Sequence, residues 1–225
     1  METALIVGAG SGLSASLARL LEKEGFQVAL AARNPEKLAA LRALALRCDA
    51  TDASQVEDAF KAVQAKWGVP DLVVYNASYR TRGPFVELNA DEVKKTLEVS
   101  AYGGFLVAQA ATKRMLPRGS GAIFFTGASA SVKGYAQSAP FAMGKFALRG
   151  LALCMARVLA PINIHVAHFV IDGGIRTAND TRAPERGDDG MLLPDEIAKS
   201  YLQVYRQHRS AWSWELELRP WVEKF

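Results

Sequence analysis

Short apolar segments alternate with longer amphipathic segments along most of this sequence. The apolar segments are almost continuously hydrophobic, which is typical of strands buried on both faces of a parallel sheet. This alternation predicts an α/β fold of three layers, with a doubly wound, mostly parallel sheet of about seven strands. The predicted strands are Ala4–Val7, Val28–Ala31, Leu72–Tyr75, Ile123–Thr126, Ile164–Val170 and, more weakly, Leu44–Cys48. The predicted helices are Ala15–Glu24, Pro35–Ala45, Ser54–Trp67, Asp91–Met115 and Phe141–Leu159.

The alternation is interrupted at Asp172–Leu193, a polar segment rich in Gly, Asp and Arg. A loop of this length in a compact domain is usually a lid or a binding loop. After it, Pro194–Gln207 is predicted to be helical, and Trp214–Leu218 alternates as a half-exposed final strand does. We therefore expect a single domain over residues 1–225, in which residues 172–207 form a substrate loop and a lid helix.

Composition excludes several other classes of protein. Of the 225 residues, 50% are hydrophobic and 22% are charged, which excludes a disordered chain. Apolar runs stay well below the ~20 residues of a membrane span, so no membrane insertion is expected. The net charge of +4 is dispersed, whereas nucleic-acid binding calls for a dense basic stripe. Three histidines and two cysteines without ligand spacing predict no metal site.

The two cysteines and the start of the chain bear on its compartment. Cys48 and Cys154 are too far apart for a redox pair, and we interpret both as buried thiols in a reducing environment. The first strand begins almost at Met1, which leaves no room for a secretion leader. We expect a cytoplasmic protein.

A glycine-rich turn follows the first predicted strand, with the sequence Gly8-Ala9-Gly10-Ser11-Gly12-Leu13-Ser14. Glycines at such a turn let backbone N–H groups approach a pyrophosphate, above the positive end of the helix that follows. The turn therefore predicts a dinucleotide site of the Rossmann type. Its expected contacts are Gly8, Ser11, Gly12 and Leu13.

This turn and three later motifs resemble those of the short-chain dehydrogenase/reductase family. Gly8-x-x-x-Gly12-x-Ser14 is similar to the family's Gly-x-x-x-Gly-x-Gly, with Ser14 at the third glycine. Asn76-Ala77-Ser78 resembles Asn-Ala-Gly, and Asp172–Thr177 resembles Pro-Gly-x-x-x-Thr. The resemblance covers essentially the whole chain. It implies adenine contacts at Asp49 and Ala50, a nicotinamide carboxamide contact at Thr177, and further cofactor contacts at Asn76, Ala77, Gly173 and Ile175.

The end of the second strand bears on the choice between NADP(H) and NAD(H). An acidic residue there would accept hydrogen bonds from the ribose hydroxyls and repel a 2′-phosphate. The sequence instead reads Leu30-Ala31-Ala32-Arg33, and a guanidinium suits charge-assisted contact with phosphate. Arg33 therefore favours NADP(H) over NAD(H). The alternative interpretation is that Arg33 is an ordinary surface charge before a helix.

The catalytic positions depart from the family's pattern. The family pairs a Tyr with a Lys four residues later; Lys145 is present, but Phe141 stands at the Tyr position. The family's Ser falls on Ala128, with Ser129 adjacent, and its Asn falls on Ser100. Three of the four positions are thus changed.

These changes remove a proton donor. The family's Tyr hydroxyl exchanges a proton with the substrate oxygen, and losing a positioned general acid costs ~10²–10⁴ in rate. Lys145 is expected to orient the nicotinamide ribose, as its family counterpart does. Ser129 is the best candidate to replace the missing Ser. The other hydroxyls in reach of the site loops are Tyr79, Tyr102, Ser131, Tyr135 and Ser138.

Two functions remain open from the sequence. The first is an NADP(H)-dependent oxidoreductase that acts on a small carbonyl, alcohol or activated alkene, with Lys145 and Ser129 as catalytic residues. The alternative is a catalytically silent NADP(H)-binding sensor or scaffold. A non-redox reaction in the same cleft, such as a dehydration, is a third. In each case the family resemblance implies a homodimer or homotetramer formed through helices such as Phe141–Leu159.

Overall fold

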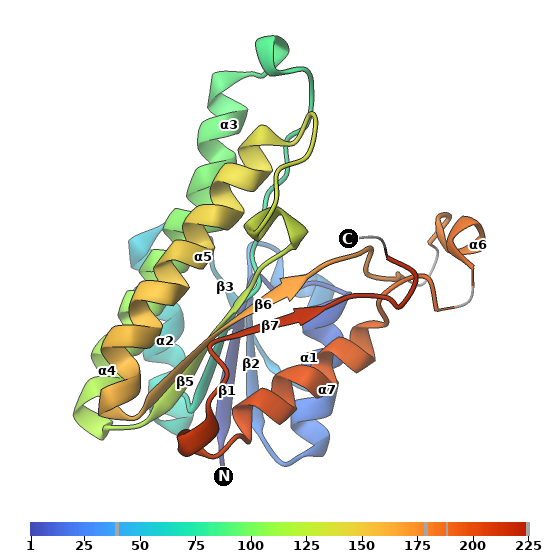
Figure 1. The fold of residues 1–225 in the computed structure, drawn as a ribbon. Coiled ribbons are helices and arrows are strands. Elements are labelled where there is room, and N and C mark those ends of the chain that lie inside the picture. Colours follow the sequence, from blue (N-terminus) through green and yellow to red (C-terminus); the bar gives the residue numbers. More distant parts are fainter. Residues whose placement is uncertain (39–40, 178–179, 188, 224–225) are drawn as a thin grey trace.

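The computed structural model describes residues 1–38, 41–177, 180–187 and 189–223. Within these residues the centre of the molecule is a seven-stranded parallel sheet in the order β3-β2-β1-β4-β5-β6-β7 (Figure 1). The predicted three-layer α/β fold is confirmed. The strands are β1 (Thr3–Val7), β2 (Gln27–Ala32), β3 (Leu44–Arg47), β4 (Leu72–Tyr75), β5 (Gly121–Thr126), β6 (Ile164–Ile171) and β7 (Glu215–Leu218).

Helices cover both faces of this sheet. On one face α1 packs beside α7, and the other carries α2, α4 and α5 (Figure 1). Short 3₁₀ turns and one π turn join the longer elements. The helices are α1 (Leu13–Lys23), α2 (Ala53–Trp67), α3 (Ala90–Leu97), α4 (Gly103–Arg118), α5 (Ala139–Leu159), α6 (Ala183–Arg186) and α7 (Pro194–Tyr205).

Two apolar clusters lie on the two sides of the sheet because neighbouring side chains of a strand point to opposite faces. In β1, Leu5 packs with α2, α4 and α5, whereas Ile6 packs with α1 and α7. All five residues of β1 and all eight of β6 are buried. Burial on both faces explains why these strands are continuous apolar runs in the sequence.

The strand order reverses at β1, which pairs with β2 on one side and β4 on the other. In open parallel sheets such a reversal leaves a crevice outside the carboxyl ends of the strands, and ligands bind there. The loops after β1, β2, β4, β5 and β6 therefore position the candidate site.

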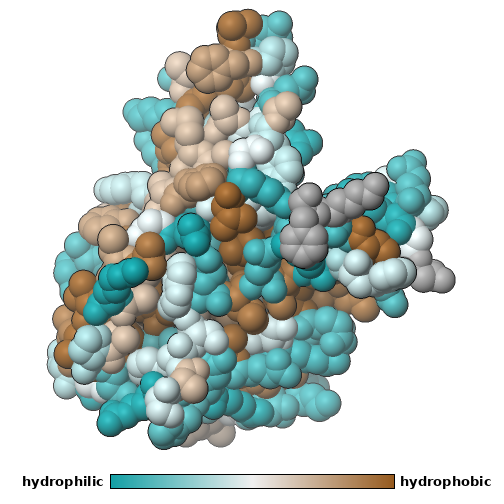
Figure 2. Space-filling view, in the orientation of Figure 1, coloured by the Kyte–Doolittle hydropathy of each residue, from teal (hydrophilic) through white to brown (hydrophobic). Residues whose placement is uncertain are grey.

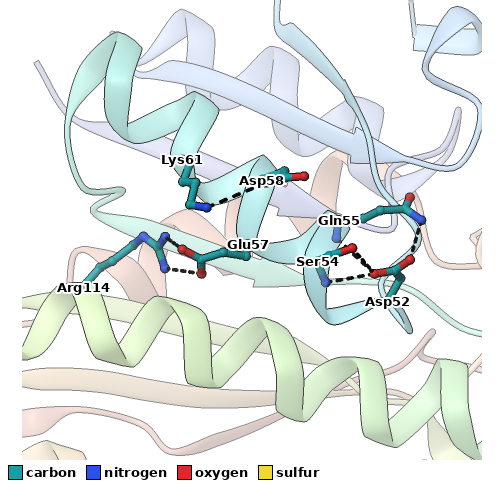
Figure 3. A network of polar contacts seen from close by, with 7 residues as sticks. All are labelled: Asp52, Ser54, Gln55, Glu57, Asp58, Lys61 and Arg114. Carbon is teal, nitrogen blue, oxygen red and sulfur yellow. Dashed lines mark hydrogen bonds and ion pairs between the residues drawn. The ribbon is translucent and has the colours of Figure 1, made fainter.

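A network of polar contacts fixes α2 against α4 (Figure 3). Asp52 caps α2, since its Oδ1 accepts hydrogen bonds from the backbone N–H of Ser54 at 2.9 Å and of Gln55 at 3.2 Å. Hydrogen bonds from the side chains of Ser54 and Gln55, together with these backbone bonds, lower the pKa of Asp52 to about 2. Arg114 of α4 makes a two-pronged contact with Glu57 of α2, at 2.6 and 3.2 Å. The two helices are thereby held side by side.

Two sequence predictions of helix are corrected. Over Pro35–Ala45 the structure has a 3₁₀ turn at Pro35–Leu38 and then β3, whose Leu44 and Ala45 pair with β2; residues 39–40 lie outside the described residues. Pairing with β2 outweighs the local helical pattern. The expected helix Asp91–Met115 is interrupted by a π turn at Glu98–Tyr102, between α3 and α4.

The prediction for one cysteine is also wrong. Cys48 is buried as expected, and burial raises the pKa of its thiol to about 11. Cys154 is exposed, on the side of α5 that lines an apolar groove with α4. Within the described ranges, no helix has the length and apolar character needed to cross a membrane.

Candidate active site

The glycine-rich turn connects β1 directly to α1. Gly8 has φ of 83°, a conformation that favours glycine, and a Cβ placed on it would lie 2.2 Å from the backbone nitrogen of Ala77. Gly10 and Gly12 face open space, with nothing within 4 Å of the position of a Cβ. Gly12 precedes α1 without a side-chain cap, so the first backbone N–H groups of the helix are available to an anion. This end of α1 fits a pyrophosphate.

Ser14 stands at the position of the third glycine in the motif that this turn resembles. Its buried hydroxyl accepts a hydrogen bond from Nδ2 of Asn76 at 2.7 Å. The backbone N–H of Asn76 donates to the carbonyl of Val7 at 2.8 Å. Ser14 and Asn76 therefore tie the first turn of α1 to the loop after β4. Leu13 is buried in the core, so only its backbone faces the turn.

A small cavity beside the glycine turn collects several predicted cofactor residues. Its volume is about 150 Å³, and the exposed Arg33 stands at its edge. The Asp49 carboxylate accepts bonds from the backbone N–H and the hydroxyl of Thr51 at 3.0 and 2.8 Å, which fixes the loop after β3. Ser11 is exposed in the turn itself. The predicted residues that line the cavity are Gly8, Arg33, Asp49, Ala50 and Ala77.

Lys145 is buried at the carboxyl end of β5. Its Nζ donates a 2.8 Å hydrogen bond to the carbonyl oxygen of Thr126, the last residue of that strand. Burial lowers the pKa of Lys145 to about 8, because an ammonium loses hydration inside the protein. The Phe141 ring lies one turn earlier on α5, with its centre 5.8 Å from Nζ.

The loop after β5 carries Ala128 and Ser129. The backbone N–H of Ala128 donates to Oγ of Ser131 at 3.1 Å, so the Ser131 hydroxyl is engaged within the loop. Ser129 is half-buried and lines a cavity of about 750 Å³. Ser100 lies buried in the π turn, and its hydroxyl is 3.4 Å from the carbonyl oxygen of Tyr79.

The 750 Å³ cavity lies at the carboxyl ends of β5 and β6. It joins Ser129 to Gly173 and Ile175, three residues that the sequence assigns to catalysis and to the cofactor. Thr177 is not among its lining residues; its N–H and hydroxyl contact Oδ2 of Asp180 at 3.2 and 3.3 Å. The segment Asp172–Leu193 therefore borders the cavity, although residues 178–179 and 188 lie outside the described part. Its movement as a lid stays a prediction, and α7 is packed into the core.

The candidate hydroxyls differ in what they contact. Tyr135 lines the same cavity as Ser129, whereas the Tyr79 hydroxyl donates to Glu92 at 2.6 Å, outside the cavity. Ser138 is buried, and its hydroxyl has no hydrogen-bond partner in the described part of the chain. No sequence motif pointed to Tyr201, whose buried hydroxyl lies 2.9 Å from Oγ1 of Thr126. Burial raises the pKa of that phenol, and the ring stacks in the core.

Four arginines that were not predicted as site residues line the larger cavity. Two of them follow β4, in Tyr79-Arg80-Thr81-Arg82, and this basic pair was a signal that could have been noticed. No group of three or more metal-ligating side chains occurs within the described ranges. The four are Arg80, Arg82, Arg182 and Arg186.

Most of the sequence matches a known protein family. Residues 2–187 match the family described as short chain dehydrogenase. D-threitol dehydrogenase of Mycolicibacterium smegmatis is 32% identical over 164 residues, which are 69% of this chain and 63% of that protein. The chain thus spans less than two thirds of that relative's length.

Solved structures extend the likeness to nearly the whole chain. A short-chain dehydrogenase from Rhodopseudomonas palustris is 34% identical with a TM-score of 0.85, covering 98% of this chain and 99% of that one. A variant of actinorhodin polyketide ketoreductase, solved with NADPH, is 25% identical with a TM-score of 0.88. It covers 97% of this chain and 96% of its own.

Proposed function

The chain belongs to the short-chain dehydrogenase family, and from this premise we propose that it is an NADP(H)-dependent oxidoreductase acting on a small carbonyl, alcohol or activated alkene. The observation that carries the proposal is the uncapped start of α1 under the Gly8 turn, beside the cavity edged by Arg33. When bound, NADP(H) supplies or accepts a hydride. The residues at the turn fit its pyrophosphate, because Gly10 and Gly12 leave open space where side chains would intrude, and Gly8 lets the turn pack closely against the backbone of Ala77.

Arg33 supports NADP(H) over NAD(H). Its side chain is exposed at the edge of the small cavity, and the neighbouring Ala32 carries no carboxylate that would repel a phosphate. A guanidinium binds phosphate oxygens through paired, charge-assisted hydrogen bonds. Asp49 and Ala50, which also line this cavity, would contact the adenine.

Lys145 and Ser129 are the proposed catalytic residues. Lys145 is held by Thr126 at the end of β5, where its ammonium would bind the nicotinamide ribose. Ser129 borders the large cavity and would hydrogen-bond the reacting oxygen, directly or through water. Gly173, Ile175 and Thr177, after β6, would adjoin the nicotinamide. Asn76 and Ala77 would line the pyrophosphate side of the site.

A silent NADP(H)-binding sensor is the second candidate. The observation in its favour is that Phe141, one turn from Lys145, offers only a ring, and that Ala128 has no hydroxyl. Such a protein would keep the affinity for the cofactor and lose the proton transfer that completes carbonyl reduction.

One set of assays separates the two candidates. NADPH oxidation is followed with a panel of aldehydes, ketones and activated alkenes, using wild type, Ser129→Ala, and Phe141→Tyr combined with Ala128→Ser. Turnover by wild type that falls ~10²–10⁴-fold in Ser129→Ala supports the oxidoreductase. Turnover found only in the double variant supports the sensor.

A homodimer or homotetramer is part of the proposal. Exposed apolar side chains mark the outer faces of α4 and α5, including Phe105 at 42% and Phe146 at 44% exposure. Hydrophobic residues also spread over the projection formed by α3 and the start of α5 (Figure 2). The molar mass in solution, measured by light scattering for wild type and for the double variant Phe105→Glu, Phe146→Glu, tests this. A wild type with the mass of a monomer would contradict it.

A further inference from the structure

The loop after β4 directs two arginines into the large cavity. Tyr79 and Thr81 are anchored on the other side of this loop, because their hydroxyls contact Oε2 of Glu92 at 2.6 and 3.4 Å. Alternate residues of an extended segment point in opposite directions. Arg80 and Arg82 accordingly line the cavity.

Further contacts hold the same loop in place. The backbone N–H of Gly83 donates to the carbonyl of Gln137 at 3.1 Å, which joins this loop to the one after β5. The guanidinium of Arg80 lies over the Phe141 ring, with its carbon 4.8 Å from the ring centre. Phe141 thus serves as an aromatic support for Arg80, because the face of an aromatic ring attracts a guanidinium.

The charges around this cavity are unequal. Four arginines line it against two carboxylates, Asp172 and Glu223. Both carboxylates already have cationic partners: Asp172 contacts Nζ of Lys133 at 3.2 Å, and Glu223 contacts Nη1 of Arg186 at 3.0 Å. Arg182 is paired with Asp180 in the same way, at 2.6 Å.

Arg80 and Arg82 form no ion pair with any residue in the described part of the chain. Burial and the neighbouring charge of Arg82 both lower the pKa of Arg80. The two positively charged guanidinium groups therefore repel one another. An anion between them would relieve this repulsion and replace lost hydration with charge-assisted hydrogen bonds.

We propose that Arg80 and Arg82 bind a carboxylate or phosphate group of the substrate, so that this protein acts on small anionic carbonyl or alcohol compounds. The inference rests on the proposed function for the reaction itself. The anion would lie at Arg80 and Arg82, in the cavity that Ser129, Gly173 and Ile175 also border. Recognition of the charged group would then place the reacting carbon next to the cofactor.

The test measures binding without turnover. Benzoate, phenyl phosphate and the neutral benzamide are titrated into the full chain by calorimetry, with no cofactor added. We expect at least one anion to bind roughly tenfold or more tightly than benzamide, since hydrogen bonds to charged groups are the strong ones. The anion that binds more tightly distinguishes a carboxylate site from a phosphate site.

Variants assign the effect to the two arginines. Arg80→Gln and Arg82→Gln should each weaken anion binding about tenfold and leave benzamide unchanged, and Arg80→Lys should recover part of the loss. The matched control is Arg209→Gln, an exposed arginine that borders a different cavity, with Gly121 and Ala122 at the amino end of β5. Circular dichroism establishes that every variant is folded.

Three results would overturn the inference: equal binding of benzamide and the anions, no binding of either anion, or the same loss in Arg209→Gln. None of these depends on turnover. Anion binding without NADPH oxidation would therefore contradict the proposed function alone, and turnover of neutral carbonyls without anion preference would contradict the inference alone.

Discussion

Among single residues, Gly8 combines a positive φ with a close approach of another part of the backbone. Its φ of 83° and the 2.2 Å that would separate an alanine Cβ from the nitrogen of Ala77 mean that an alanine would be strained and would also clash with backbone. We predict that Gly8→Ala lowers the free energy of unfolding by about 3 kcal/mol or more. Urea unfolding measures this loss, and NADPH titration should show weaker binding.

Gly10 offers a control in the same turn. A Cβ there would meet nothing within 4 Å, so Gly10→Ala should change the free energy of unfolding by less than about 1 kcal/mol. Equal losses of stability in the two variants would contradict the account of Gly8.

The buried Lys145 should make the stability of the protein depend on pH. Its ordinary pKa of 10.5 falls to about 8 in the folded protein, so between these values the unfolded chain holds a proton that the folded chain does not. Stability from this group therefore rises with pH across that window, by about 3 kcal/mol in total, and is constant below it.

The comparison variant is Lys145→Met, which has no titrating group. We expect the stability of wild type relative to this variant to increase between about pH 8 and about pH 10, measured by urea unfolding at each pH. A difference that does not change with pH would show that Lys145 keeps an ordinary pKa.

At the scale of elements, the edge strand β7 pairs with β6 and is also tied to α5 through Glu215. Glu215 accepts two hydrogen bonds from Arg149 of α5, at 2.7 and 2.8 Å, and lies 3.0 Å from Nδ1 of His168 on β6. His168 is fully buried, and burial lowers its pKa to about 4. Three elements are thus joined at one carboxylate.

We predict that Glu215→Gln destabilises the protein by about 2 kcal/mol, because Arg149 loses its charged partner in a partly buried place. Hydrogen exchange of the β7 amides should rise more than that of β1. The control is Glu196→Gln, which removes an exposed pair with Lys199 and should cost less than about 1 kcal/mol. Uniform exchange across the sheet would contradict the local role of Glu215.

Over the whole molecule, the buried strands such as β1, β4 and β6 were predictable because each is apolar enough to be recognised alone. Where burial is partial the prediction of secondary structure was poorer. In β3, half-buried and exposed residues alternate. The end of the segment Pro35–Ala45 is a strand because it pairs with β2, and the local sequence does not show this pairing. The glycine turn was local, so its place after β1 followed directly from the sequence. The cofactor and catalytic roles assigned to individual residues remain predictions.

The large cavity could not be predicted in the same way. Its lining comes from loops after β4, β5, β6 and β7 and from α6. Two pairs of arginines meet there, Arg80 with Arg82 and Arg182 with Arg186, and the pairs are about 100 residues apart in the chain. Likewise, the exposure of Cys154 depends on which side of α5 faces the sheet. Neither fact is contained in a local pattern.

Binding of the cofactor should stabilise the whole molecule. The candidate binding residues lie in loops after β1, β2, β3, β4 and β6 and on α5, so a dinucleotide would bridge most of the sheet. At a concentration of about 100 times Kd, NADPH should add about 2.7 kcal/mol to stability. For a chain of this size that raises Tm by roughly 5–10 °C.

Arg33 is the residue that we propose for the choice between NADPH and NADH. We expect NADPH to raise Tm more than NADH at equal concentration, and Arg33→Gln to remove the difference by weakening NADPH alone. Arg42→Gln, another exposed arginine that does not line the small cavity, is the control and should behave as wild type. No shift with either nucleotide would contradict both candidate functions, since each requires the bound cofactor. If NADPH and NADH raise Tm equally, and Arg33→Gln changes neither shift, the dinucleotide site would still be supported. Only its preference for the 2′-phosphate would be contradicted.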